Sequence, residues 1–342
     1  MAEKKVTIQD IATKLGMAKS TVSKALSGAT DINEQTRERV LSCAGEMGYQ
    51  IKSNKTAFTK NLLVFIYGIH YDKVDQFGYE IILGIQTAAA ERSIGVNIVA
   101  INDDELKNGS YYSVVSGNYE GIVFLGFKPH RNFVEHVQGM NIPMVVLDNH
   151  VECPMTARVG CDNSDGIRQM VRYLYSKGHD KIGFLGGEEA SIVTAERKKA
   201  YSDALAELGL EEDPKSVKYG YFSGKGTKKR ILEIAETGAT AVVCISDLLA
   251  CTAVKELIKA GYSVPKDISV TGYDNLPFSE YSQPSITTMN QNRIHIGKTI
   301  FSMLQQMRSG IDISSVMLRP VLVERESVRA IQERELPKEK DD

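Results

Sequence analysis

The feature that most constrains the fold is a run at residues 6–26 that reads as two short helices joined at a glycine. Its first half repeats apolar residues at helical spacing, namely Ile8, Ile11, Ala12 and Leu15. Gly16 then supplies a turn, and a second helical pattern follows in which Val22, Ala25 and Leu26 face inward. Because Ala12 is small, we expect another helix to cross close to it.

The second helix of this pair carries a polar outer face that suits a nucleic acid. Its outward residues are Lys19, Ser20, Thr21, Ser23 and Lys24, and residues 18–26 contain no acid. Short hydroxyls can bond phosphate oxygens, whereas long cations reach phosphates or base edges. The pattern predicts a DNA-binding helix-turn-helix, in which Lys19, Ser20 and Lys24 contact base edges while Thr7, Thr21 and Ser23 hold phosphates. The alternative is an ordinary helical hairpin with a solvated polar face.

A third helix is expected to begin after Asn33, a plausible N-cap, with Glu34 in its positive first turn and Gly48 at its end. With Thr21-Val22-Ser23 before it, the order Thr-Arg-Glu-Arg-Val-Leu followed by Met47-Gly48-Tyr49 closely resembles the DNA-binding headpiece of the LacI/GalR family of transcription regulators. In that family the first two residues of the recognition helix usually set operator preference. The resemblance therefore implies this role for Lys19 and Ser20.

The segment after this headpiece departs from the family pattern. Most members place Pro-Asn after the Gly-Tyr pair and then Ala-Arg-x-Leu, a helix that inserts leucines into the minor groove. Here Gly48-Tyr49 is followed by residues 50–61 without that pattern. Counting from Tyr49 puts Phe58 at the position of the wedge, and phenylalanine can fill that role.

Length and charge set limits on the whole chain. At 342 residues with 42% hydrophobic residues, the chain can form two or three folded units. The formal net charge of -2 means that any electrostatic attraction to DNA must be local. Lysines supply that attraction within the first 60 residues, at positions 4, 5, 14, 19, 24, 52, 55 and 60.

Cysteine spacing and apolar runs indicate a cytoplasmic protein. The five cysteines have no C-x-x-C spacing and no histidine at metal-ligand intervals, so we expect reduced core residues and no metal. No signal peptide is recognisable, and the early apolar run at residues 62–69 is too short to span a bilayer. We therefore expect no membrane partner.

From residue 62 onward, short β-rich runs alternate with helical stretches. The expected strands are 62–67, 96–101, 121–127, 144–147, 181–185, 217–222, 241–245 and 269–272, and the expected helices include 79–92, 164–177, 196–208 and 248–259. This alternation is typical of parallel sheets covered by helices. Two such arrays in tandem predict an α/β core of two doubly wound lobes, with a ligand cleft at the carboxyl ends of the strands.

This part of the chain resembles the core of periplasmic sugar-binding proteins that the LacI/GalR family carries. The matching segments are residues 159–163 with Gly166, residues 177–187, and residues 269–275 with 284–288. In the family the chain crosses between the lobes three times. The resemblance implies a helix-turn-helix domain at 1–50, a hinge at 51–61 and an effector-binding core at 62–332, with lobe 1 at about 62–160 and 291–320 and lobe 2 at about 161–290 and 321–332. The charged tail at 333–342 is expected to be disordered.

Polar and aromatic residues fall where strands are expected to end or helices to begin. They are Asp148, Arg197, Phe222, Asp247 and Asp274, and four of them match positions that commonly line the family's effector cleft: Arg197, Phe222, Asp247 and Asp274. Carboxylates and a guanidinium around an aromatic face suit a sugar-like effector with several hydroxyls. An aspartate that ends a strand can instead cap the next helix, which is as good an explanation for Asp247. His70 and Phe77 follow the first strand and are equally explained by packing or by ligand contact.

These features predict a DNA-binding transcriptional regulator, most simply a repressor, whose operator affinity a sugar-like effector controls. Two half-sites compensate for the small surface of one recognition helix, so we expect a homodimer, as in the family. The alternatives are a cytosolic sugar-binding protein and a sugar-metabolising enzyme. Against an enzyme, residues 223–228 lack the glycine spacing of a P-loop, no G-x-G-x-x-G follows the first strand, and no nucleophile elbow or cofactor motif is present.

Overall fold

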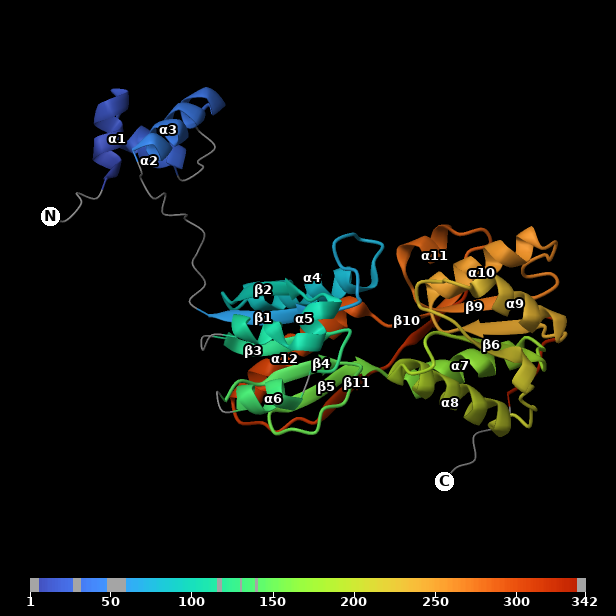
Figure 1. Cartoon of the computed structure of the whole chain (residues 1–342). Coiled ribbons are helices and arrows are strands. Elements are labelled where there is room, and N and C mark those ends of the chain that lie inside the picture. Colours follow the sequence, from blue (N-terminus) through green and yellow to red (C-terminus); the bar gives the residue numbers. More distant parts are fainter. Residues whose placement is uncertain are drawn as a thin grey trace. The chain divides into compact units, whose positions relative to one another are not determined.

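The structure is a computed structural model, and it describes residues 6–26, 32–47, 60–115, 119–129, 131–138 and 141–336 (Figure 1). The chain divides into two compact units, Met1–Thr59 and Lys60–Asp342. We call the first unit the headpiece and the second the core.

Three helices form the headpiece: α1 (Ile8–Leu15), α2 (Lys19–Leu26) and α3 (Glu34–Glu46). The turn after α1 depends on Gly16, whose φ of 62° is in the left-handed region that favours glycine. The fully buried side chains Ile11, Val22 and Val40 bring one apolar residue from each helix into a shared core. This arrangement confirms the predicted helix-turn-helix.

The start of α3 follows the sequence prediction. The side-chain oxygen of Asn33 accepts a hydrogen bond from the amide of Thr36 at 2.7 Å, which is the N-cap geometry. The predicted helix end at Gly48 and the predicted wedge residue Phe58 lie outside the described residues.

The first lobe of the core contains a six-stranded sheet in which every neighbouring pair is parallel. Its strands are β1 (Asn61–Ile66), β2 (Gly95–Ala100), β3 (Tyr119–Leu125), β4 (Met144–Leu147), β5 (Thr156–Cys161) and β11 (Ser315–Leu318), in the order β11-β5-β4-β3-β1-β2. The associated helices are α4 (Phe77–Ala90), α5 (Asp103–Asn108), α6 (Arg131–Gln138), α12 (Arg293–Arg308) and a 3-10 turn at Ser110–Val114. Leu62 and Val64 of β1 pack in one cluster and Leu63 and Phe65 in another, so side chains on both faces of the sheet are buried.

The second lobe repeats this architecture. Its strands are β6 (Ile182–Gly186), β7 (Val217–Tyr219), β8 (Ala241–Cys244), β9 (Ser269–Asp274), β10 (Thr287–Asn290) and β12 (Val321–Val323), in the order β12-β10-β9-β8-β6-β7. The helices are α7 (Asn163–Ser176), α8 (Ile192–Glu207), α9 (Thr227–Glu236), α10 (Asp247–Lys259), α11 (Pro277–Tyr281) and a 3-10 turn at Pro214–Ser216. Only the β10–β12 pair is antiparallel among the described strands of this sheet. The two doubly wound lobes predicted from the sequence are confirmed.

The chain passes between the lobes three times. It enters lobe 2 between β5 and α7, returns to lobe 1 between β10 and α12, and re-enters lobe 2 between β11 and β12, as Figure 1 allows the reader to follow. In lobe 1, α12 packs against α4 at two facing glycines. A Cβ on Gly297 would overlap the carbonyl oxygen of Ile81, and one on Gly84 would overlap that of Ile294. This close approach fixes the helix that follows the second crossing.

The start of the charged tail is held against lobe 2. The backbone amide of Arg334 donates to the carbonyl of Ser176 at 2.8 Å, and its guanidinium pairs with Asp180 at 3.1 Å. The disorder predicted for 333–342 stays a prediction, and residues 337–342 lie outside the described residues. No helix in the described part of the chain combines the length and the apolar character that a membrane crossing requires.

Candidate functional site

The outer face of α2 presents the polar residues that the sequence singled out. Lys19, Ser20, Ser23 and Lys24 are exposed and Thr21 is half-buried, whereas Val22 and Ala25 are buried against the other helices. The first turn of α2 contains no acidic residue. This helix can therefore offer hydroxyl and ammonium donors to an anionic surface.

Thr7 has a structural role in the headpiece. It is the N-cap of α1: its hydroxyl donates to a carboxylate oxygen of Asp10 at 2.6 Å and accepts from the amide of Asp10 at 3.3 Å. This capping box fixes the first turn of α1. The hydroxyl proton is thus already used, although the side chain remains exposed.

A cavity of about 620 Å³ lies between the two lobes of the core. Lobe 1 contributes the segments that follow β1, β3 and β4, and lobe 2 contributes the start of α8 and the segments that follow β7, β8, β9 and β10. Six of the seven predicted effector-binding residues line it: His70, Phe77, Asp148, Arg197, Phe222 and Asp274. The carboxyl ends of strands from both lobes therefore meet at this cavity, as expected for doubly wound sheets.

Asp148 is one of the carboxylates that line the cavity from lobe 1. It directly follows β4, where its φ of 58° is in the left-handed region, which aspartate tolerates better than most residues. Within the described part of the chain, no hydrogen bond reaches its carboxylate. Burial raises the pKa of Asp148 from 3.8 to about 6, although the positive charges of Arg197 and Arg158 lower it in part. The cavity thus contains a carboxylate whose acceptor capacity is unused.

Arg197 is the cation that lobe 2 places in the cavity. Only 4% of its surface is exposed, and its guanidinium carbon lies 3.6 Å from the centre of the Tyr273 ring. Its Nε donates to the side-chain oxygen of Asn163 at 2.8 Å, and its Nη1 donates to the carbonyl of Ile245. Stacking and two hydrogen bonds therefore fix the guanidinium plane before any ligand arrives.

Asp274 ends β9 in a strained backbone conformation. Its φ is 114° and that of Asn275 is 54°, so two successive non-glycine residues have positive φ at the cavity wall. The carboxylate accepts from the side-chain amide of Gln291 at 2.5 Å. Burial raises the pKa of Asp274 from 3.8 to about 6, an effect opposed by Arg197 and Arg293.

The prediction for Asp247 requires correction, because this residue does not line the cavity. Its side chain is fully buried, and its carboxylate accepts hydrogen bonds from the amide of Leu276 at 2.6 Å and the hydroxyl of Thr288 at 2.5 Å. Nor does it cap the following helix, since Ser246 is the N-cap of α10. Burial, followed by the nearby charge of Asp274, raises the pKa of Asp247 to about 7. Asp247 instead supports the loop after β9 from behind the cavity wall.

Several lining residues were not predicted. The polar ones are Asp75, Gln76, Asn149, Ser191, Ser223, Ser246 and Gln291, and Phe278 adds a third aromatic ring to Phe77 and Phe222. Asn149 and Ser223 directly follow predicted residues, so the same strand-end argument could have found them. Gln291 follows β10, which the sequence did not reveal as a strand.

A glycine shapes the aromatic wall. A Cβ on Gly187 would press into the ring of Phe222, so the absence of a side chain lets this ring lie against the backbone after β6. The amide of Phe222 also donates to the carboxylate of Glu188 at 3.2 Å. These contacts hold one aromatic face in the cavity wall, suited to stacking against the C–H face of a sugar ring.

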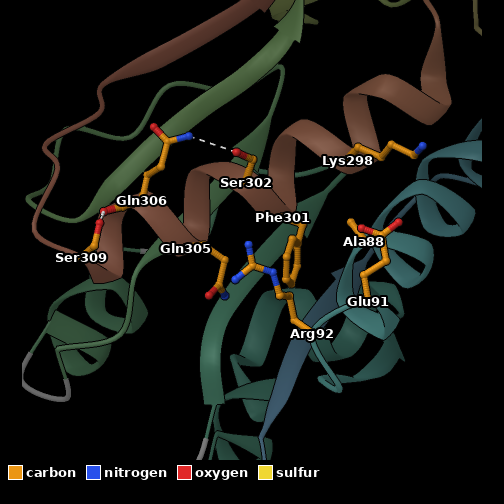
Figure 2. Close-up of a pocket in the computed structure, with 9 residues that line it drawn as sticks. All are labelled: Ala88, Glu91, Arg92, Lys298, Phe301, Ser302, Gln305, Gln306 and Ser309. Atoms are coloured by element: carbon orange, nitrogen blue, oxygen red, sulfur yellow. Dashed lines mark hydrogen bonds between the residues drawn. The ribbon is translucent and has the colours of Figure 1, made fainter.

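A second hollow, of about 440 Å³, lies on lobe 1 between the end of α4 and α12 (Figure 2). Arg92 and Lys298 are both exposed there, but Figure 2 shows them pointing in different directions. Gln306 donates to the hydroxyl of Ser302 at 3.0 Å across one wall. None of the predicted site residues borders this hollow. The described residues contain no group of three or more His, Cys, Asp or Glu side chains arranged to hold a metal ion.

Two family models match the chain. Residues 7–51 match the model described as "Bacterial regulatory proteins, lacI family", and residues 171–328 match "Periplasmic binding protein-like domain". The first match covers α1, α2 and α3, and the second covers most of lobe 2 together with α12 and β11 of lobe 1.

Several relatives match the chain over most of its length. A probable HTH-type transcriptional repressor ExuR of Bacillus subtilis (strain 168) is 30% identical over 84% of this chain and 86% of its own length. The HTH-type transcriptional repressor CytR of Escherichia coli (strain K12) is 29% identical over 96% of this chain and 98% of its own. The solved complex of the transcriptional regulator CelR with cellobiose is 25% identical, with a TM-score of 0.68, over 94% of this chain and 100% of that one.

Proposed function

Since the chain belongs to the lacI family of bacterial regulatory proteins, and is thus a DNA-binding transcriptional regulator rather than an enzyme, we propose that it is a repressor controlled by a sugar-like effector bound between its lobes. The effector changes operator affinity by binding one arrangement of the lobes more tightly than another. A ligand can shift such an equilibrium only by this difference in affinity.

The observation that carries the proposal is the carboxylate of Asp148, which lines the interlobe cavity and has no hydrogen-bond donor among the described residues. A buried acceptor of this kind is satisfied by a ligand hydroxyl. Arg197 offers a fixed cationic donor from the opposite lobe, and Asp274 offers a second acceptor. Together with the ring of Phe222, these groups fit a sugar with several hydroxyls and an apolar face.

The size of the cavity agrees with this ligand class. Its volume of about 620 Å³ lies within the range of roughly 300–1,000 Å³ that is usual for small-molecule sites. The related regulator CelR was solved with cellobiose bound. Both facts support a mono- or disaccharide, while His70 and Phe77 would contact it from lobe 1.

The headpiece supplies operator recognition in this proposal. Lys19, Ser20 and Lys24 read base edges in the major groove, while Thr21 and Ser23 hold phosphates. Thr7 would hold a phosphate by turning its hydroxyl proton from Asp10 to a phosphate oxygen at the start of α1, where the helix dipole favours an anion. Phe58 acts as a minor-groove wedge.

We expect the active form to be a homodimer, because two recognition helices related by a twofold axis double the DNA contact area. The core exposes large apolar side chains that a second copy could cover, including Tyr281 on α11, which is 80% exposed. Sedimentation velocity at operator-binding concentrations should detect a dimer. A wild-type protein that remains monomeric at those concentrations would contradict the dimer.

A thermal-shift screen of sugars and sugar phosphates tests the effector proposal. A specific ligand at about 100 times its Kd stabilises the folded state by roughly 2.7 kcal/mol, which is a measurable rise in melting temperature. The rise should disappear in Arg197→Ala and persist in Arg168→Ala. Arg168 is a suitable control because it lies on α7 of the same lobe, half-exposed and paired with Glu207 at 3.4 Å. Equal rises in both variants would place the ligand elsewhere.

A further inference from the structure

An ion pair joins the lobes beside the first chain crossing. Arg158 lies on β5 of lobe 1, and Glu196 lies in the first half of α8 in lobe 2. Nη2 of Arg158 donates to both carboxylate oxygens of Glu196, at 2.7 and 2.9 Å. The two side chains are only 17% and 30% exposed, so solvent screens this pair less than it screens a surface pair.

Asn163 extends this ion pair toward the cavity. Its Nδ2 donates to Glu196 at 2.8 Å, and its Oδ1 accepts from Nε of Arg197, also at 2.8 Å. Because both ends of the amide are used, Asn163 cannot rotate without losing one of the two bonds. It is the first residue of α7 and only 3% exposed. The contacts form one unbroken network from β5 of lobe 1 to the guanidinium of Arg197.

The network affects the conformation of Arg197, the cation that lines the cavity. Glu196 and Arg197 are neighbours on α8, yet Glu196 binds a residue of lobe 1 while Arg197 lines the cavity. If the lobes move apart at β5 and Arg158 is withdrawn, Glu196 keeps a half-buried charge with Asn163 as its remaining donor. Such a loss of one partner is costly, so the carboxylate and the amide would rearrange toward water. Nε of Arg197 would then lose its acceptor.

We propose that Arg158 and Glu196 are positioning residues that act through Asn163: they complete the set of contacts that holds Arg197 in its ligand-facing orientation, and this set is complete only in this arrangement of the lobes. The proposal rests on the proposed function, in which Arg197 contacts the effector. It makes the site sensitive to the arrangement of the lobes: ligand affinity depends on a residue of lobe 1 that does not line the cavity.

The test compares Arg158→Met with Lys198→Met in the full-length, ligand-free protein. Lys198 is a matched control because it also lies on α8 and pairs with Glu212 at 2.9 Å, with exposures of 19% and 28%, but both partners belong to lobe 2 and neither lines the cavity. NMR measures the solvent-exchange rate of the Arg197 Nε–H proton, whose signal is identified by its loss in Arg197→Lys. We expect Arg158→Met to speed this exchange by at least about fivefold, and Lys198→Met to leave it within about twofold of the wild type.

Conservative and alternative variants keep the result interpretable. Arg158→Lys retains the cation and should restore slow exchange. Glu196→Gln should speed the exchange, as Arg158→Met does, and it takes the place of Arg158→Met in the test if that variant does not fold. Unchanged exchange in Arg158→Met or, should that variant not fold, in Glu196→Gln would overturn the proposal. Equal acceleration in Lys198→Met would also overturn it. Because the measurement needs no ligand, failure to find a sugar would count against the proposed function and leave this result standing.

Discussion

The acidic side chains behind the strand ends differ in what their oxygens contact. Asp148 has no protein donor in the described part of the chain, Asp274 accepts from Gln291, and Asp247 accepts from both Leu276 and Thr288. The sequence could place all three at strand ends. It could not separate a lining residue from a buried support, because that depends on the direction in which the next loop turns. Gly272 of β9 shows on which side Asp247 lies: a Cβ on this glycine would overlap a carboxylate oxygen of Asp247, so the carboxylate packs against the strand.

Asp148 should make stability depend on pH in a defined direction. Its pKa is raised from 3.8 to about 6, so between these values the folded protein retains a proton that the unfolded chain releases. Stability therefore falls as pH rises through this window, and above pH 6 the folded state carries the full cost of a buried charge, at most about 2–3 kcal/mol. Asp148→Asn removes that cost without changing the shape of the side chain.

Scanning calorimetry of the ligand-free protein measures the effect. At pH 8 we expect Asp148→Asn to melt roughly 2–6 °C above the wild type, with the gap closing toward pH 4. Asp72→Asn is the control, because Asp72 is exposed in a loop of the same lobe, and it should show no such pH-dependent gap. A variant that melts below the wild type at pH 8 would refute this account of the Asp148 environment.

Several of the strands that the sequence predicted have continuous apolar runs. β1, β3, β4 and β8 are almost wholly buried and were placed within two residues of their observed ends. The missed strands β5, β10, β11 and β12 contain charged or polar residues, or pair at an edge of a sheet. Their pairing is decided by chain segments distant in sequence, which a local pattern does not contain.

The contact between α4 and α12 depends on the absence of side chains at Gly84 and Gly297. Gly297→Ala should lower the free energy of unfolding by about 2–3 kcal/mol, because the added methyl group overlaps the backbone of α4. Urea unfolding measures this loss. Ser302→Ala, on the exposed side of the same helix, should change it by less than about 0.5 kcal/mol. Equal stability of Gly297→Ala and the wild type would mean that the helices can move apart at little cost.

The outer face of α2 should determine which operator is bound. Replacing Lys19 and Ser20 together by alanine should change the sequence recovered from a pool of randomised DNA, since these side chains are proposed to contact base edges. Binding to non-specific DNA should fall by no more than about tenfold, because most phosphate contacts remain. Arg39→Ala, exposed on α3, is the control and should recover the wild-type sequence. An unchanged preference in the double variant would remove α2 from base readout.

Across the whole molecule, the proposed response of the core to a ligand rests on the three crossings between its lobes and on the cavity between them. A ligand held by Asp148 of lobe 1 and Arg197 of lobe 2 stabilises the arrangement in which both groups reach it. The network of Arg158, Glu196 and Asn163 lies between the lobes. In the proposed positioning role, it makes the orientation of Arg197 depend on that same arrangement. In the proposed function, ligand binding and lobe arrangement are therefore coupled, and by thermodynamic reciprocity so are ligand and operator affinity.

The most direct test of this coupling is the operator affinity of wild type and Arg197→Ala, measured by fluorescence anisotropy with and without the sugar that the thermal-shift screen identifies. We predict that the sugar changes the wild-type Kd by about fivefold or more. Arg197→Ala should bind operator with near-normal affinity and show no response at the same sugar concentration, because Arg197 lies in the core and not in the headpiece. An unaltered wild-type Kd, or a variant that responds at wild-type sugar concentrations, would contradict effector control through the interlobe cavity.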